Sequence, residues 1–333
     1  MLNIFFDINY IKTKKVFLTR SLKHSKFINL IIDCGNIFKI PISERFIFSG
    51  PHKRMNNILK TFKGPDFSIN KKKFKNNYIV NFDSGTESLL QDLLKDPYNK
   101  IIIGPLFNVE YQKKLIRYTN DYPNIKKLVA SDAAYNNAVY ELGLNVEPEN
   151  VYVCPSGVIS KKELNKNRAE YKRDDKCLVY FKKREKKDLR LVLNFLDSMG
   201  LKYELFEYGK YSNKALMNAA KKSRFGVYIS CVESQGFAVQ ELMACNLPLY
   251  VWDDLKANAE NLSKYYGGGN FSGTTVTLWS ENNGVIVNSY KEFEDKFEEF
   301  LLNVDNYSPT KLVDEYLTFE SFQNKLLSLF SEF

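Results

Sequence analysis

The feature that most constrains the fold of this chain is the repeated alternation of short apolar segments with amphipathic ones. In the first half, the predicted strands are residues 26–36, 76–85, 99–107, 125–132 and 149–157. Between them, apolar residues return at helical spacing, which predicts helices at 86–96, 109–123 and 133–144. Alternation of this kind is typical of a parallel sheet that is covered by helices on both faces.

The alternation stops at residues 156–175, which are polar, rich in Lys and without apolar periodicity, and then starts again. The second run predicts strands at 176–183, 201–209 and 224–231, and helices at 186–200, 213–223 and 318–330. Because 333 residues exceed the usual size of one domain, we expect two α/β domains with a boundary in the polar segment.

Two carboxylates stand where the strand 224–231 passes into the next helix. Glu233 lies in the loop and Glu241 lies within the helix. Ligands of parallel α/β domains collect at this carboxyl edge, and we expect Ser234 to cap the helix while Gly236 lets its backbone approach a ligand. Helix amides favour an anion, and a carboxylate can accept two hydrogen bonds from a vicinal diol such as ribose. The pattern therefore fits a phosphate group flanked by two sugars.

The stretch VESQGFAVQELMACNLPLYVWD, residues 232–253, resembles the Glu-x7-Glu segment of retaining glycosyltransferases of the GT-B fold, the group-one family. The likeness extends to LVASDAAYNNAVYELGL and to LVYFKKREKKDLRLVLNFL, and it covers roughly residues 125–290. It implies an α/β chain with two Rossmann-like domains facing across a cleft. Residues 1–157 would form the acceptor-side domain, residues 158–310 the domain that binds the nucleotide-sugar donor, and residues 311–333 a helix crossing back to the first domain.

The resemblance also implies roles for single residues. Glu233 would contact the donor sugar as a catalytic group, and Glu241 would bind the ribose. Gly236 and Phe237 would lend backbone amides near the sugar and phosphates, and Gln235 and Ser234 belong to the same donor-binding loop. Five cations lie at the end of the strand 176–183 and just after it, where the family has Gly-Arg, and which of them holds the phosphates is left open: Lys182, Lys183, Arg184, Lys186 and Lys187. On the acceptor side, His52 is a second catalytic candidate, and the stretch 104–107 is a candidate wall of the cleft.

We expect a UDP- or GDP-sugar donor, no cofactor and no metal, since the chain has two His and five scattered Cys without a CxxC pair. The odd, scattered Cys favour a reducing compartment. The N-terminus lacks the pattern of a signal peptide, and no apolar run approaches the roughly 20 residues of a membrane span, so we expect a cytoplasmic protein. The acceptor could be a glycan, a glycoprotein or a lipid.

The net charge of +9 is unevenly distributed. Residues 1–155 carry +9, residues 156–224 carry +10 and residues 225–333 carry −10. The basic blocks predict an anionic acceptor or a peripheral contact with a membrane surface. They also leave open a protein that binds polyanions or nucleic acid, although the aromatic residues follow core periodicities. A catalytically inactive scaffold is a further alternative. A nicotinamide-dependent oxidoreductase would need G-x-G-x-x-G after a strand, and the only similar stretch is the loop 265–270.

Overall fold

The computed structural model describes residues 1–5, 50–80, 84–105, 109–141, 145, 147–168 and 173–333. The predicted strand 26–36 and the end of the stretch 104–107 lie outside the described residues. In three short segments, residues 50–52, 84–85 and 109–113, only the backbone is described.

The first sheet has six parallel strands in the order β2-β1-β3-β4-β5-β6. Its strands are β1 (Leu2–Phe5), β2 (Phe67–Ile69), β3 (Asn76–Ile79), β4 (Lys100–Ile103), β5 (Ile125–Val129) and β6 (Val151–Val153). The helices between them are α3 (Gly50–Thr61), α4 (Ser84–Leu93), α5 (Val109–Asp121), α6 (Asp132–Asn136), a π-helical turn (Asn137–Glu141) and a 3-10 turn (Pro148–Asn150). We call this unit the first lobe. Almost every residue of its central strands is buried, as expected for a sheet covered on both faces.

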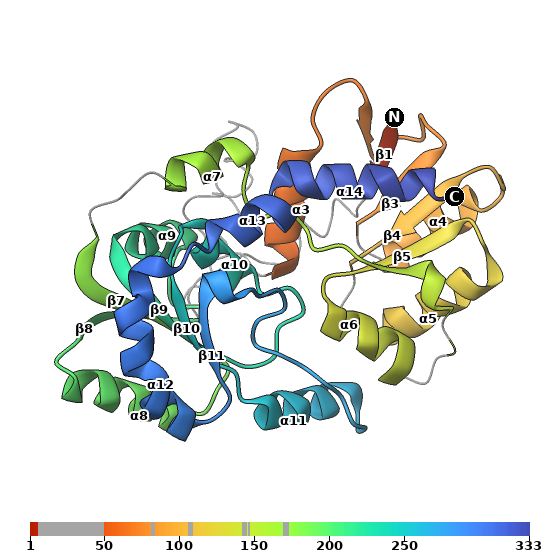
Figure 1. Cartoon of the computed structure of the whole chain (residues 1–333). Coiled ribbons are helices and arrows are strands. Elements are labelled where there is room, and N and C mark those ends of the chain that lie inside the picture. The colour runs from red at the N-terminus through yellow and green to blue at the C-terminus, as the bar shows by residue number, and fades with distance from the viewer. Residues whose placement is uncertain (6–49, 81–83, 106–108, 142–144, 146, 169–172) are drawn as a thin grey trace, which may run out of the picture.

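The second sheet has five parallel strands in the order β11-β10-β9-β7-β8. Its strands are β7 (Asp174–Lys182), β8 (Lys202–Glu207), β9 (Ser223–Ser230), β10 (Leu249–Trp252) and β11 (Gly284–Val287). Its helices are α8 (Lys186–Ser198), α9 (Asn213–Lys222), α10 (Phe237–Ala244), α11 (Leu255–Tyr266) and α12 (Tyr290–Asn303). We call this unit the second lobe. Figure 1 shows the two lobes side by side, each with helices around its sheet.

Two connectors join the lobes and are hydrogen-bonded to each other. The Val158 amide donates to the Leu317 carbonyl at 2.8 Å, and the Phe319 amide donates to the Ile159 carbonyl at 2.8 Å. Gly157 allows this approach, because a Cβ there would lie 2.7 Å from the Thr318 carbonyl oxygen. We call residues 154–160 and 317–319 the paired connectors.

The C-terminal helices divide between the two lobes. In α13 (Thr310–Tyr316), Leu312 and Val313 pack into the second-lobe core. Figure 1 shows α14 (Phe319–Ser331) beside α3 on the first lobe. Four apolar residues of α14 belong to the first-lobe core: Phe322, Leu326, Leu329 and Phe330. The predicted helix 318–330 is therefore confirmed as an element, and it lies on the first lobe. We propose one domain boundary at 157/158, as expected from the sequence. For the second boundary we propose residues 317–319 in place of the expected 310/311, because α13 packs into the second-lobe core.

Two expectations about local structure are wrong. The polar segment 156–175 contains the helix α7 (Lys161–Arg168), in which Leu164 is buried and Asn167 donates to the Ala244 carbonyl at 2.8 Å. Helix α4 begins at Ser84, two positions before the predicted start at Thr86. After α10, Asn246 takes the left-handed conformation, with φ of 56°.

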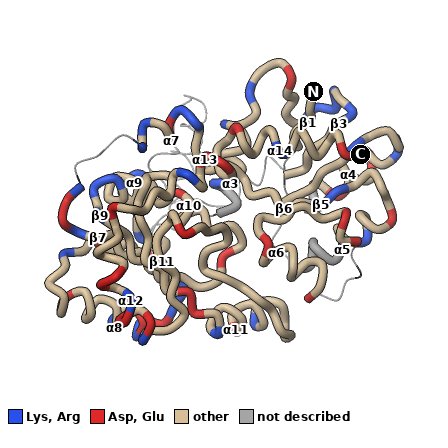
Figure 2. Tube along the Cα trace, viewed as in Figure 1, with Lys and Arg blue, Asp and Glu red and all other residues tan. Residues whose placement is uncertain are grey.

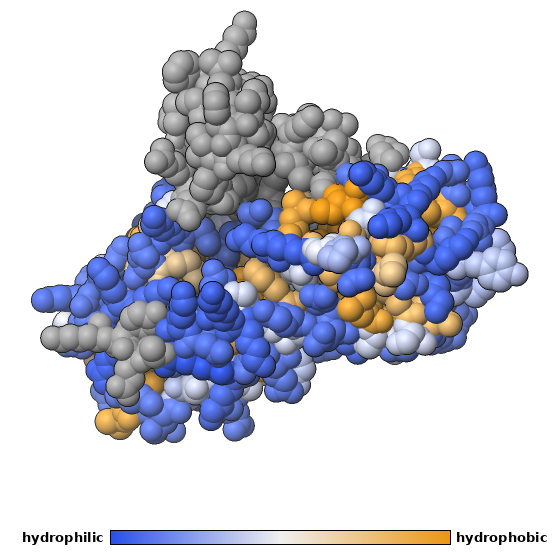
Figure 3. All heavy atoms as spheres, turned by 90° about the horizontal axis from the view of Figure 1, so that it is seen from above, coloured by the Kyte–Doolittle hydropathy of each residue, from blue (hydrophilic) through white to orange (hydrophobic). Residues whose placement is uncertain are grey.

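Lysine and arginine are prominent on α7 and α9, whereas α12 is acidic (Figure 2). The described part of the face in Figure 3 is mostly hydrophilic, with hydrophobic residues gathered in smaller areas. In the part of the chain that the structure describes, no helix is long and apolar enough to cross a membrane.

Candidate active site

Glu233 lies at the carboxyl edge of the second sheet, in the loop that leads from β9 to α10. Its side chain is paired with Lys182, the last residue of the neighbouring strand β7, at 2.5 Å between Nζ and Oε1. The Ser230 hydroxyl donates to the same oxygen at 3.1 Å. The Glu233 amide donates to the Thr274 carbonyl at 3.0 Å, which fixes the loop from a third side. Glu233 is thus held in place by residues of three separate segments.

The charge of Glu233 acts on its neighbours. Burial lowers the pKa of Lys182, but the charge of Glu233 and its hydrogen bond outweigh burial, so the net shift of the Lys182 pKa is upward. Burial raises the pKa of Cys231, and Glu233 adds to that rise while Lys182 and Lys183 oppose it. Burial likewise raises the pKa of Tyr211, whose hydroxyl donates to the Tyr180 hydroxyl at 3.2 Å. At neutral pH, therefore, Lys182 is charged and these two tyrosines are protonated.

Helix α10 begins at Phe237, after a left-handed residue at Gly236 with φ of 75°. A Cβ at Gly236 would lie 2.9 Å from Val239 Cγ1, so both the conformation and the space favour glycine. The expectation that Ser234 caps this helix is wrong, because the chain turns at Gly236 and no side chain caps the first turn. The first-turn amides of α10 have no partner within the helix, and the start of a helix favours an anion.

Gln235 is buried and joins the loop to a paired connector. Its Nε2 donates to the Ser156 carbonyl at 2.7 Å, and its Oε1 accepts from the Ser156 amide at 3.2 Å. Nε2 also donates to Gln240 Oε1 at 3.0 Å. The side chain is thus committed to positioning the loop, while its role in donor binding stays a prediction.

Glu241 lies in the second turn of α10 and is only 8% exposed. Its Oε2 is 2.6 Å from Lys53 Nζ, on helix α3 of the first lobe. Asn213, the first residue of α9, accepts from Lys53 Nζ at 2.8 Å and donates to Glu241 Oε1 at 3.4 Å. The predicted ribose carboxylate is therefore already paired, and its partner belongs to the opposite lobe.

The structure separates the five predicted phosphate cations. The side chain of Arg184 is only 3% exposed, lies over the Trp252 ring at 4.6 Å, and pairs with Asp188 at 2.9 Å and Asp254 at 3.3 Å. Lys186 pairs with Glu207, and Lys187 with Glu185, both on the surface. Lys183 is exposed, and the structure gives it no ion pair with any described residue. Lys182 thus pairs with Glu233, and Arg184 is held by two carboxylates, while the choice of the cation that holds the phosphates stays a prediction.

Sequence reasoning missed Lys53, Asn213 and Ser230. Asn213 and Ser230 lie at the ends of predicted elements on the carboxyl edge of the second sheet. Because ligands of parallel sheets bind at that edge, both residues could have been selected from the sequence. Lys53 lies 188 positions from Glu241, and no pattern in the sequence joins the two. His52 lies in the first turn of α3, but its side chain is outside what the structure describes.

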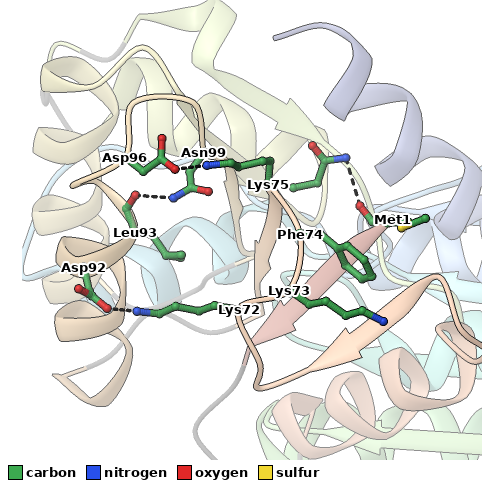
Figure 4. Close-up of a pocket in the computed structure, with 10 residues that line it drawn as sticks. Met1, Lys72, Lys73, Phe74, Lys75, Asp92, Leu93, Asp96 and Asn99 are labelled. Carbon is green, nitrogen blue, oxygen red and sulfur yellow. Dashed lines mark hydrogen bonds and ion pairs between the residues drawn. The ribbon is translucent and has the colours of Figure 1, made fainter.

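A pocket of about 520 Å³ lies away from this site, at the opposite edge of the first sheet. Figure 4 shows its lining, which includes Lys72 paired with Asp92 and Lys75 paired with Asp96. Met1, Asn76 and Asn99 place it where strands begin, whereas ligands of parallel sheets bind where strands end. The pocket is therefore not our candidate active site. As a separate point, no group of three or more His, Cys, Asp or Glu among the described residues is placed to hold a metal ion.

Comparison with known proteins identifies the fold. No family model matches the chain, and no curated protein sequence matches it. A variant of S. aureus TarM, solved with fondaparinux, alpha-GlcNAc-glycerol and UDP, has a TM-score of 0.51 at 14% identity. That match covers 78% of this chain and 56% of TarM. The GtfA/B complex has a TM-score of 0.50 at 10% identity, with 87% of this chain and 61% of the other covered.

The apo lipopolysaccharide outer core galactosyltransferase WaaB has a TM-score of 0.51 at 11% identity, with 88% of this chain and 98% of WaaB covered. The chain thus spans nearly all of WaaB, but less than two thirds of the other two proteins. At these identities the likeness shows the fold: two parallel α/β sheets arranged as in GT-B glycosyltransferases.

Proposed function

We propose that this chain transfers a sugar from a nucleotide-sugar donor to an acceptor, with retention of the anomeric configuration. The observation that carries the proposal is the pair of carboxylates around the start of α10. Glu233 and Glu241 flank the first-turn amides of α10, which have no partner within the helix, at the edge of a parallel sheet where ligands bind. The solved TarM variant contained UDP, so UDP-sugars are the first donors to test.

In the proposed arrangement, the diphosphate lies against the α10 amides, with Lys182 and Lys183 beside it. Glu241 accepts hydrogen bonds from the ribose hydroxyls, and Glu233 faces the donor sugar. As the bond between the anomeric carbon and the phosphate oxygen breaks, both electrons leave with the diphosphate. The leaving phosphate oxygen takes the proton of the acceptor hydroxyl, whose oxygen bonds to the same face of the sugar. Fixed donors and cations that stabilise the diphosphate supply the main catalytic effect.

The proposal about the acceptor rests only on charge. We propose that the first lobe faces an anionic acceptor, a glycan or a lipid, or an anionic membrane surface, because residues 1–155 carry +9. Binding to vesicles with anionic lipid at low salt, and its loss at high salt, would support this part of the proposal. No binding to acidic vesicles or acidic glycans at low salt would refute it.

The test of the proposed activity compares UDP-, GDP- and ADP-sugars by thermal shift and calorimetry, because a ligand of the native state raises its stability. Glu241→Ala should weaken donor binding by about 1–3 kcal/mol, the scale of lost charged hydrogen bonds. Glu233→Gln should lower turnover more than donor affinity, since the charge acts where the sugar becomes positive. Activity should survive EDTA.

The matched control is Glu260→Gln, an exposed carboxylate on α11, which should change neither value. If no nucleotide sugar binds, or if both active-site variants retain wild-type affinity and turnover, the proposed function is wrong.

A further inference from the structure

Lys53, on helix α3 of the first lobe, forms an ion pair with Glu241, a predicted donor-binding carboxylate of the second lobe. Its Nζ contacts Glu241 Oε2 at 2.6 Å and Asn213 Oδ1 at 2.8 Å, and both partners belong to the second lobe. The side chains of Lys53 and Glu241 are only 14% and 10% exposed. The contact is thus a partly buried ion pair that joins the two lobes at the proposed nucleoside site.

Helix α3, which carries Lys53, is fixed to the first lobe. The next residue, Arg54, is buried and donates to the Pro105 carbonyl, just after β4. Three apolar residues of the helix and the segment after it pack in the first-lobe core: Met55, Ile58 and Phe62. Lys53 therefore moves with the first lobe, whereas Glu241 moves with the second.

The ammonium of Lys53 and a ribose diol require the same carboxylate. With Lys53 on Oε2 and Asn213 near Oε1, both oxygens of Glu241 have a partner. Each carboxylate oxygen can accept two hydrogen bonds, but the Glu241 side chain is only 10% exposed, so a diol that donates to both oxygens competes with these partners for the carboxylate. An ammonium that the diol displaces loses its charged contact, and nucleoside binding is then weakened by the cost of breaking this contact between the lobes.

We infer that Lys53 is a latch that closes the nucleoside subsite of the free protein, and that nucleotide binding opens it. The inference rests on the proposed function, because it assigns Glu241 to the ribose. It adds that donor binding is coupled to the contact between the lobes, so that a residue of the first lobe lowers the affinity of a subsite in the second.

The test uses the full chain and the variant Lys53→Met, which keeps the length of the side chain and removes its charge. Affinities for UDP, GDP and ADP are measured by calorimetry, with Lys60→Met as the matched control, an exposed lysine of the same helix. Losing the competing ion pair should tighten nucleotide binding by about tenfold, whereas the control should bind as the wild type does. In a Glu241→Gln background, Lys53→Met should no longer change affinity.

A second measurement is independent of nucleotide. Thermal unfolding of the two single variants and the double variant should show non-additive changes in Tm, because the two residues contact each other. If the wild type binds a nucleotide and Lys53→Met binds it with the same or lower affinity, the latch is overturned and the proposed function is left intact. If no nucleotide binds to wild type or variant, the proposed function fails and the latch fails with it, even where the Tm changes are non-additive.

Discussion

Breaking the ion pair between Lys182 and Glu233 should destabilise the fold by an amount that the structure allows us to work out. At an effective dielectric constant of about 20, opposite charges 2.5 Å apart attract by about 6–7 kcal/mol. Most of that attraction offsets the cost of removing both ions from water. Removing one partner of a fully buried pair costs about 3–5 kcal/mol. Since these side chains are 16% and 10% exposed, we expect about 2–4 kcal/mol for Lys182→Met or Glu233→Gln.

The double variant separates this interaction from other effects of the substitutions. Lys182→Met together with Glu233→Gln leaves neither charge buried, so the double variant should be destabilised by less than the sum of the single variants. We expect a coupling energy of about 2 kcal/mol, measured by urea unfolding at equilibrium. The exposed pair Lys187 and Glu185, treated in the same way, is the control and should show no coupling that the assay resolves. Additive effects at Lys182 and Glu233 would refute the reasoning.

The dependence on pH follows from the direction of the pKa shift. The pKa of Lys182 is raised in the folded state, chiefly through Glu233 acting against burial. The stabilisation is therefore complete below the unfolded-state pKa of about 10.4 and is lost as pH rises through the higher folded-state pKa. The difference in free energy of unfolding between wild type and Lys182→Met should be constant between about pH 6 and 9, where Lys182 does not titrate. It should shrink above about pH 10.4, where the unfolded chain loses the proton.

Phe322→Ala should lower the free energy of unfolding by about 3–5 kcal/mol, because the ring is buried and lies 5.9 Å from the Phe62 ring; urea unfolding would measure it. Gly157→Ala should cost about 1–3 kcal/mol in the same assay, since the new methyl group would lie 2.7 Å from the Thr318 carbonyl oxygen and force the paired connectors apart. Burial lowers the pKa of Lys127 to about 7, so between about pH 7 and 10 the unfolded chain binds a proton there that the folded chain does not. The free energy of unfolding of the wild type should therefore rise with pH in this range, and Lys127→Met should remove that rise. Unfolding curves at several pH values would show whether that rise persists in the variant.

Elements with several regularly spaced apolar residues could be predicted from the sequence. The helix predicted at 186–200 is observed at Lys186–Ser198, and its buried face includes Leu189, Val192 and Leu196 at helical spacing. The strand predicted at 224–231 is observed at Ser223–Ser230, buried at nearly every position. Helix α7 gave no such signal, because it buries a single apolar residue and is otherwise attached through polar contacts.

The partners of the charged residues could not all be predicted, because several of them come from distant segments. Arg184 follows a strand as a phosphate cation would, yet it pairs with Asp188, four positions away, and with Asp254, 70 positions away. Glu241 could be selected from its place on the helix, but its pairing with Lys53 depends on how the lobes meet. Sequence spacing therefore identified the candidate charged groups, and three-dimensional packing determines which of them form ion pairs within the protein.

The placement of α14 has a consequence for how the chain is made. The first-lobe core unites Leu2 and Ile4, near one end of the sequence, with Phe322 and Leu326, near the other. The strands of the second lobe, in contrast, all lie within residues 174–287. During translation the second lobe can complete its sheet while the first still lacks a covering helix. The nascent first lobe then presents an uncovered apolar surface until the residues of α14 leave the ribosome, and at that stage the chain is most exposed to aggregation and to capture by chaperones.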